Sequence, residues 1–127
     1  ANTELFFELA KYYEITKNKT KKKELCQKLK SAKLSLALKE YAYNTLMSVE
    51  KNGILVTYGE EDTYPIWILQ TIENIRTDVK VVNYDLLVNN SYRSQIAKNY
   101  KLKFYQIFKK KIVFDYSSEN IQYKSGM

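Results

Sequence analysis

Histidine is missing from this sequence, and its 127 residues include only one cysteine, one proline and three glycines. Without histidine, the chain has no Ser-His-Asp or Cys-His nucleophilic site, no histidine acid–base chemistry and no histidine-containing zinc site. Because Cys26 has no cysteine partner, no disulfide forms within the chain, and we expect a small buried residue there. The longest apolar runs are far shorter than the roughly 18 residues of a membrane-spanning helix. No signal peptide is visible.

The composition, 45% hydrophobic and 28% charged residues, is that of an ordinary globular chain. A net charge of +7 favours an anionic partner, but the basic excess lies at the two ends of the chain. Residues 52–90 carry two basic and six acidic side chains. Only Arg76 and Arg93 are arginines, and arginine is the usual residue for bidentate recognition of phosphates and bases. A solvated lysine surface is therefore favoured over a dedicated polyanion site.

Helical periodicity dominates the first 50 residues. Residues 3–15 predict an amphipathic helix, with Thr3 as its N-cap and a stripe formed by Leu5, Leu9, Tyr12 or Tyr13, and Ile15. A polar connection is predicted at residues 16–23. Residues 23–49 predict either one long helix or two helices joined near residues 31–35, and Asn52 and Gly53 then provide the stop.

A strand–helix–strand pattern follows. Residues 54–58 predict a buried strand, residues 66–75 a helix with Pro65 in its first turn and Asp62 or Thr63 as its cap, and residues 79–84 a second strand. A loop at residues 85–90 and a helix at residues 91–100 complete the pattern. The fold class is therefore α/β, an N-terminal helical pair followed by a βαβ unit of a small, mostly parallel sheet.

A single α/β domain over residues 1–127 fits this order, with residues 1–50 helical, residues 53–100 the βαβ-type core and residues 101–127 a C-terminal extension. Two arrangements of the extension fit its pattern. Residues 104–108 and 112–116 form either a hairpin around residues 109–111 or a helix followed by a strand, and residues 117–127 look polar and frayed.

The loop at residues 59–65 lies at the carboxyl end of a predicted strand and opens a helix, which is where open α/β sheets bind ligands. Its carboxylates would occupy the free N–H groups of the helix and repel a phosphate, and glycine-rich nucleotide motifs are missing. The acids would instead bind a hard cation, hydrogen-bond sugar hydroxyls, or only cap the helix. We expect no cofactor. The candidate ligand-binding residues are Glu60, Glu61, Asp62, Thr63, Tyr64, Trp67 and Asp85.

Tyrosines and a tryptophan surround this loop: Tyr41, Tyr43, Tyr58, Tyr64, Trp67 and Tyr84. Aromatic rings stack on sugars and on bases alike, so their number does not choose between these ligands. Packing in the core or at its rim is the more frequent use of such residues, and a ligand platform is the alternative.

Two motifs carry a resemblance to a known family. Gly59-Glu60-Glu61-Asp62-Thr63-Tyr64-Pro65-Ile66-Trp67 and Arg76-Thr77-Asp78-Val79 resemble the Gly-Asp-Asn-Asp-Thr-Phe-Pro-Leu-Trp loop and the Arg-Pro-Asp-Val turn of bacterial multi-pass membrane proteins related to the transmembrane protein O-mannosyltransferases. The resemblance covers residues 40–98, which correspond to the segment after the membrane spans. Glu60, Glu61, Tyr64 and Thr77 depart from the usual residues.

The resemblance implies an extracytoplasmic (periplasmic) accessory domain of a membrane-embedded parent chain, without catalytic activity of its own, that recognises a glycan or a protein acceptor. A nucleic-acid-binding protein that uses lysines of residues 19–33 and 98–111 is the alternative. An enzyme that uses Glu60, Glu61 or Asp62 as a metal ligand or as a general acid or base ranks below both. A purely structural or oligomerisation role for the tyrosine-rich helices also stays open.

Overall fold

The computed structural model describes residues 3–101, 103–107, 111–116 and 121–124, with side chains for residues 4–101. The chain divides into two compact units, residues 1–86 (unit 1) and residues 87–127 (unit 2), and each is described by itself. The expectation of a single domain over the whole chain stays a prediction.

Three helices precede the first strand of unit 1: α1 (Thr3–Ile15), α2 (Lys19–Lys33) and α3 (Leu36–Met47). The break in residues 23–49 confirms the two-helix alternative, because the Ser35 hydroxyl accepts the Leu38 N–H at 3.1 Å and starts a new helix. The polar connection was predicted too long. Asn18 caps α2 by accepting the Lys21 N–H, so the lysine-rich stretch from Lys19 onward is helical.

The face that α1 buries differs from the predicted stripe. Phe7 and Ala10 are buried, whereas Leu5, Leu9 and Tyr12 lie on the opposite, exposed side of the helix. The helix carries apolar residues on two sides, and tertiary packing covers the side with Phe7 and Ala10. Thr3 is the first residue of α1, and its side chain lies outside the described part of the chain.

The predicted βαβ unit is confirmed. Strand β1 (Ile54–Thr57) pairs in parallel with β2 (Lys80–Asn83), and α4 (Glu60–Thr71) lies between them in sequence. The cap of α4 is Gly59, not Asp62 or Thr63, and Pro65 lies beyond the first turn, inside the helix. The predicted loop at residues 85–90 is instead mostly the 3₁₀-helix η1 (Tyr84–Val88).

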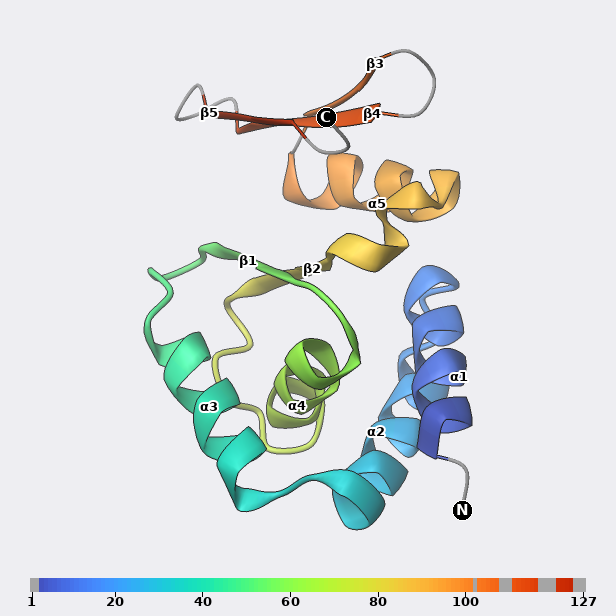
Figure 1. Cartoon of the computed structure of the whole chain (residues 1–127), viewed down its shortest axis with the longest axis vertical. Helices are drawn as coiled ribbons and strands as arrows, with labels where there is room; N and C mark the ends of the chain where they lie inside the picture. Colours follow the sequence, from blue (N-terminus) through green and yellow to red (C-terminus); the bar gives the residue numbers. More distant parts are fainter. Residues whose placement is uncertain (1–2, 102, 108–110, 117–120, 125–127) are drawn as a thin grey trace. The chain divides into compact units, whose positions relative to one another are not determined.

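Helix α4 forms the centre of unit 1, with α2 and α3 on either side of it (Figure 1). Each residue from Thr63 to Leu69 is buried, so α4 has no solvent face along that stretch. Cys26 is fully buried in the same core, as expected. The core collects apolar side chains from every surrounding element: Phe7, Ala10, Leu25, Cys26, Leu29, Ala42, Leu46, Val79 and Val81.

Unit 2 contains α5 (Asn90–Tyr100) and a three-stranded antiparallel sheet, in which β3 (Lys103–Ile107), β4 (Lys111–Tyr116) and β5 (Ile121–Lys124) are neighbours in chain order. Asn89 caps α5 by accepting the Tyr92 N–H. The hairpin alternative for residues 104–116 is therefore confirmed, whereas β5 was missed because its segment looked polar. Residues 109 and 110 of the predicted turn lie outside the described residues, and Lys111, its third residue, begins β4.

Candidate functional site

The carboxyl ends of β1 and β2 lie side by side and each leads into a tyrosine. Thr57 and Asn83 are register partners, so Tyr58 and Tyr84 leave the two strands at the same level. Their rings meet edge to face with centroids 5.6 Å apart, and Tyr58 is 69% exposed. This edge of the sheet therefore presents an aromatic pair to solvent.

Two carboxylates converge on the same edge. The Tyr58 N–H donates to Asp62 Oδ2 and the Gly59 N–H donates to Asp85 Oδ2, both at 2.8 Å. Gly59 has φ +87 and ψ 170, a conformation that other residues rarely adopt, and this turn directs consecutive N–H groups toward the two acids. We call the four residues Tyr58, Tyr84, Asp62 and Asp85 the β1–β2 edge site.

Thr63 supports this edge site from behind. Its hydroxyl donates to the Gly59 carbonyl at 2.6 Å and lies 2.8 Å from the Thr57 hydroxyl, and both threonines are buried. These contacts join the first turn of α4 to the end of β1. Thr63 thus holds the loop in shape and has no surface to offer a ligand.

Glu60 and Glu61 point to other roles. Glu60 forms an ion pair with Lys33, and this hydrogen bond raises the pKa of the lysine. The pair ties the start of α4 to the end of α2, where the Tyr64 hydroxyl also donates to the Lys33 carbonyl at 3.3 Å. Glu61 is exposed, and among the described residues no hydrogen bond or ion pair joins its side chain to the edge site.

Tyr64 and Trp67 lie in the core. Phe7 of α1 contacts both rings, with centroids 6.5 Å from Tyr64 and 5.8 Å from Trp67, and burial raises the pKa of Tyr64. The Lys22 ammonium lies over the Trp67 ring, 4.5 Å from its centroid, and pairs with Glu14 at 2.8 Å. A ligand would reach these two rings only if α1 and α2 moved away.

Of the seven residues predicted for the site, the structure therefore brings Asp62 and Asp85 together at the surface with Thr63 behind them. Tyr58 and Tyr84, which were predicted only as aromatic residues near the loop, belong to this edge as well. A usable indication was present, because each tyrosine directly follows the last residue of a predicted parallel strand. Within the described residues, no group of three or more acidic or cysteine side chains is placed to hold a metal ion.

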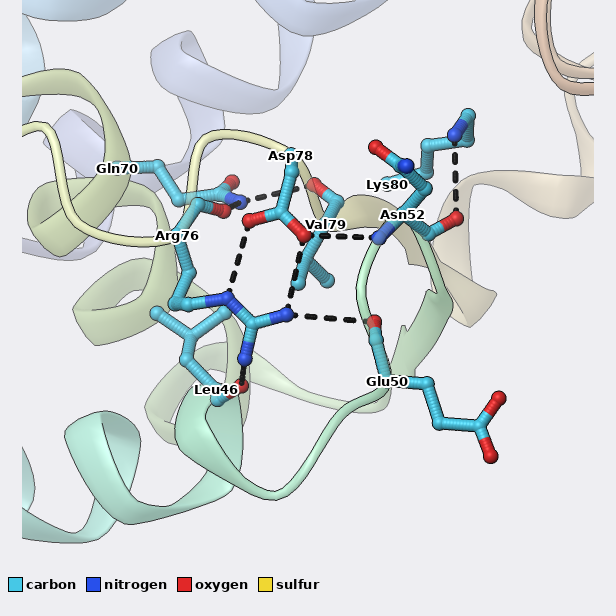
Figure 2. A network of polar contacts seen from close by, with 8 residues as sticks. All are labelled: Leu46, Glu50, Asn52, Gln70, Arg76, Asp78, Val79 and Lys80. Carbon is cyan, nitrogen blue, oxygen red and sulfur yellow. Dashed lines mark hydrogen bonds and ion pairs between the residues drawn. The ribbon is translucent and has the colours of Figure 1, made fainter.

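The second motif, at residues 76–79, forms a closed network (Figure 2). The Arg76 guanidinium donates to Asp78 from Nε and Nη2, each at 3.0 Å, and to the Leu46 and Glu50 carbonyls at 2.7 and 3.2 Å. Asp78 also accepts the Asn52 N–H at 2.8 Å. Arg76 and Asn52 together hold the pKa of Asp78 far below its ordinary value.

We call this network of Arg76, Asp78 and the backbone groups that they contact the Arg76 clasp, and its role is structural. It satisfies carbonyls at the carboxyl end of α3 and fixes the turn that leads into β2. Gln70 of α4 completes it by donating to the carbonyls of Arg76 and Val79, both at 2.9 Å. Arg76 itself has a left-handed φ of +48, and the ring of hydrogen bonds holds it there.

Within the ranges that the structure describes, some lysines of α2 form ion pairs with acidic side chains, and others do not. Lys22, Lys30 and Lys33 pair with Glu14, Glu73 and Glu60. Lys19 and Lys23 are exposed, and no ion pair or hydrogen bond of their side chains occurs among the described residues. Lys21 also pairs with Glu24, so four of the seven lysines of α2 are paired with acidic side chains of the protein.

These observations define a small α/β domain whose central helix is enclosed by its neighbours and whose sheet ends in an open aromatic and acidic edge. None of the helices within the described ranges has the length and hydropathy needed to cross a bilayer.

The chain belongs to the family described as TMEM260-associated domain 2, whose model matches residues 38–123. The match includes both motifs and extends from α3 to β5, so it confirms the link to membrane proteins related to the protein O-mannosyltransferases, of which TMEM260 is one. Helices α1 and α2 precede the matched range. No curated protein and no solved structure matches the chain significantly.

Proposed function

We propose that this chain is a non-catalytic accessory domain of a bacterial TMEM260-like membrane protein of surface glycosylation, that it acts on the extracytoplasmic (periplasmic) side, and that it recognises a glycan or protein acceptor at the β1–β2 edge site. The family match supports the accessory role within a TMEM260-like protein. The exposure of Tyr58 beside Asp62 and Asp85 is the observation that supports the site.

The chemistry of the edge suits a polar, uncharged ligand. A tyrosine ring packs against the C–H face of a sugar or against a peptide plane, and its hydroxyl stays in water. Each carboxylate accepts a backbone N–H with one oxygen and has a second oxygen that can accept a hydroxyl or amide proton. A phosphate group is disfavoured, because two negative charges already occupy the N–H groups that would bind it.

The decisive comparison uses two exposed tyrosines. Tyr58 and Tyr41 are 69% and 61% exposed, and Tyr41 lies on α3, outside the edge site. The probes are methyl α-mannoside, an oligomannoside, and one serine- and threonine-rich peptide with and without O-linked mannose. We expect at least one probe to bind the whole chain, with affinity reduced about tenfold or more by Tyr58→Ala and unchanged by Tyr41→Ala, measured by NMR titration.

Asp85→Asn tests the acidic part of the site. The asparagine keeps an oxygen for the Gly59 N–H, so the loop keeps its shape while the charge is removed. We expect weaker binding with an unchanged unfolding midpoint. Absence of binding for every probe at millimolar concentration, or equal losses in Tyr58→Ala and Tyr41→Ala, would show that the edge site does not recognise these acceptors.

A further inference from the structure

Helix α1 exposes an apolar stripe on the side that faces away from the core of unit 1. Leu5, Leu9 and Tyr12 are spaced four and three residues apart, so they lie on one face of the helix, and they are 50%, 36% and 57% exposed. Phe7 and Ala10 on the opposite face are in the core. A solvated helix normally carries polar residues on its outer face, and this one carries two leucines and a tyrosine.

Three lysines that form no ion pair among the described residues come after this stripe in the chain, in the turn between α1 and α2 and in the first turns of α2. The Tyr12 carbonyl accepts the Thr16 N–H at 3.0 Å, so the turn that carries Lys17 and leads into α2 begins one helical turn after Tyr12. Lys17, Lys19 and Lys23 are exposed, and within the described part of the chain their side chains form no ion pair. The hairpin therefore combines exposed apolar residues with three free positive charges.

We propose that this hairpin surface, formed by Leu5, Leu9, Tyr12, Lys17, Lys19 and Lys23, docks on an anionic lipid bilayer. Leucines that enter the boundary between headgroups and acyl chains, a tyrosine at headgroup level and lysines above the anionic lipids are the pattern of a helix that lies on a membrane surface. Lysine is a compact point charge, which suits headgroups better than the planar geometry of base recognition.

The family explains why a bilayer lies within reach. The chain belongs to a family associated with a membrane protein, and its hairpin lies outside the matched residues 38–123. Tethering to a membrane-embedded parent raises the effective concentration of lipid, so a weak surface interaction is sufficient to orient the domain. Nucleic acid would contact the lysines and would not account for the exposed apolar side chains of Leu5 and Leu9. Tethering rests on the membrane-embedded parent of the proposed function, but the docking surface is separate from the β1–β2 edge site, so failure of acceptor binding at that site would leave the docking proposal standing.

The test measures co-sedimentation of the whole chain with vesicles of phosphatidylcholine alone and of phosphatidylcholine with about 30% phosphatidylglycerol, at low and at high salt. We expect binding only to the anionic vesicles, weakened by salt. Two variants, Leu9→Ser with Tyr12→Ser, and Lys17→Gln with Lys19→Gln and Lys23→Gln, should each reduce partitioning about tenfold. All five positions are exposed, and circular dichroism verifies that both variants stay folded.

A matched control removes the same charge elsewhere. Lys51→Gln with Lys98→Gln and Lys101→Gln changes three other exposed lysines, and partitioning should stay within about twofold of the unmodified chain. Equal losses of vesicle partitioning in the two variants with three lysine substitutions would show that only net charge matters, and this result would overturn the proposal. Binding of a DNA duplex with the same lysine dependence, without vesicle binding, would assign the surface to nucleic acid. Self-association that Leu9→Ser with Tyr12→Ser abolishes, again without vesicle binding, would assign it to a second copy of the chain.

Discussion

The loops at the two ends of α4 both carry family motifs and charged residues, and they use those residues differently. In the Arg76 clasp, the guanidinium and the Asp78 carboxylate bond to each other and to backbone groups of α3 and the following turn (Figure 2). At the β1–β2 edge site, Asp62 and Asp85 each fix one backbone N–H and stand beside an exposed tyrosine. The motif at one loop is thus fully used in holding the fold, whereas the motif at the other loop leaves an exposed surface.

The aromatic residues in and next to the Gly59–Trp67 motif show the same contrast between exposed and buried positions. Tyr58 precedes Gly59 and is exposed, whereas Tyr64 and Trp67 follow it and are buried. The difference arises because Tyr58 ends a strand at an open edge, while Tyr64 and Trp67 lie on a helix that is covered by α1 and α2. Four changes test how far these two contrasts hold.

The largest expected effect comes from the buried aromatic ring. Trp67→Ala removes the ring that packs against Phe7 and leaves a cavity, which should lower the free energy of unfolding by about 3–5 kcal/mol. Urea denaturation measures the change. Trp67→Phe keeps most of the apolar volume and should cost clearly less. A loss below about 1 kcal/mol for Trp67→Ala would contradict the assignment of this ring to the core.

Gly59→Ala should have an intermediate effect. No atom lies within 4 Å of the position that a Cβ would take, so the cost is conformational and comes from φ +87. We expect a loss of about 1–3 kcal/mol in the free energy of unfolding. D-alanine, introduced by semisynthesis, adopts positive φ readily and should restore stability. Equal losses for L- and D-alanine would instead indicate a steric cause.

The Arg76 clasp should respond to acid. Because the folded-state pKa of Asp78 lies below its ordinary value of 3.8, its contribution to stability is complete above about pH 4 and is lost as the pH falls further. Asp78→Asn should therefore destabilise the chain at pH 6, and the difference from the unmodified chain should shrink toward pH 2.5. Urea midpoints across this range measure it.

The control for this pH series is Glu40→Gln, which changes an exposed carboxylate on α3. Its difference from the unmodified chain should stay small at every pH, because surface charges contribute little. A difference for Asp78→Asn that stayed constant with pH would show that the carboxylate charge does not stabilise the clasp.

The smallest effect on stability is expected at the open aromatic residue. Tyr58→Ala removes a largely exposed ring and should change the free energy of unfolding by less than about 0.5 kcal/mol, although it should weaken acceptor binding. Thermal unfolding measures the first quantity. A loss as large as that of Trp67→Ala would make Tyr58 part of the packing and would remove the contrast between the two loops.

The strand–helix–strand order, the burial of Cys26 and the family link were predictable from the sequence, because they depend on local pattern and spacing. The break in residues 23–49 was one of two alternatives that the same pattern allowed. Short-range chemistry also predicted where the acidic loop would lie, at the carboxyl end of a parallel strand. The predicted helix boundaries were less accurate near residues 19 and 60. The sequence offers several candidate N-caps there, and the structure uses Asn18 and Gly59.

Which side of each element is covered depends on packing between elements that are distant in the chain. Helix α1 has apolar residues on two sides, and the choice of Phe7 over Leu5 and Leu9 depends on α2 and α4. For the same reason Trp67 is in the core and Tyr58 is at the surface, although both are aromatic residues near one loop. The local sequence shows which apolar side chains an element carries. Whether a side chain is buried depends on contacts with elements that are distant in the chain, and the apolar pattern of one element does not identify them.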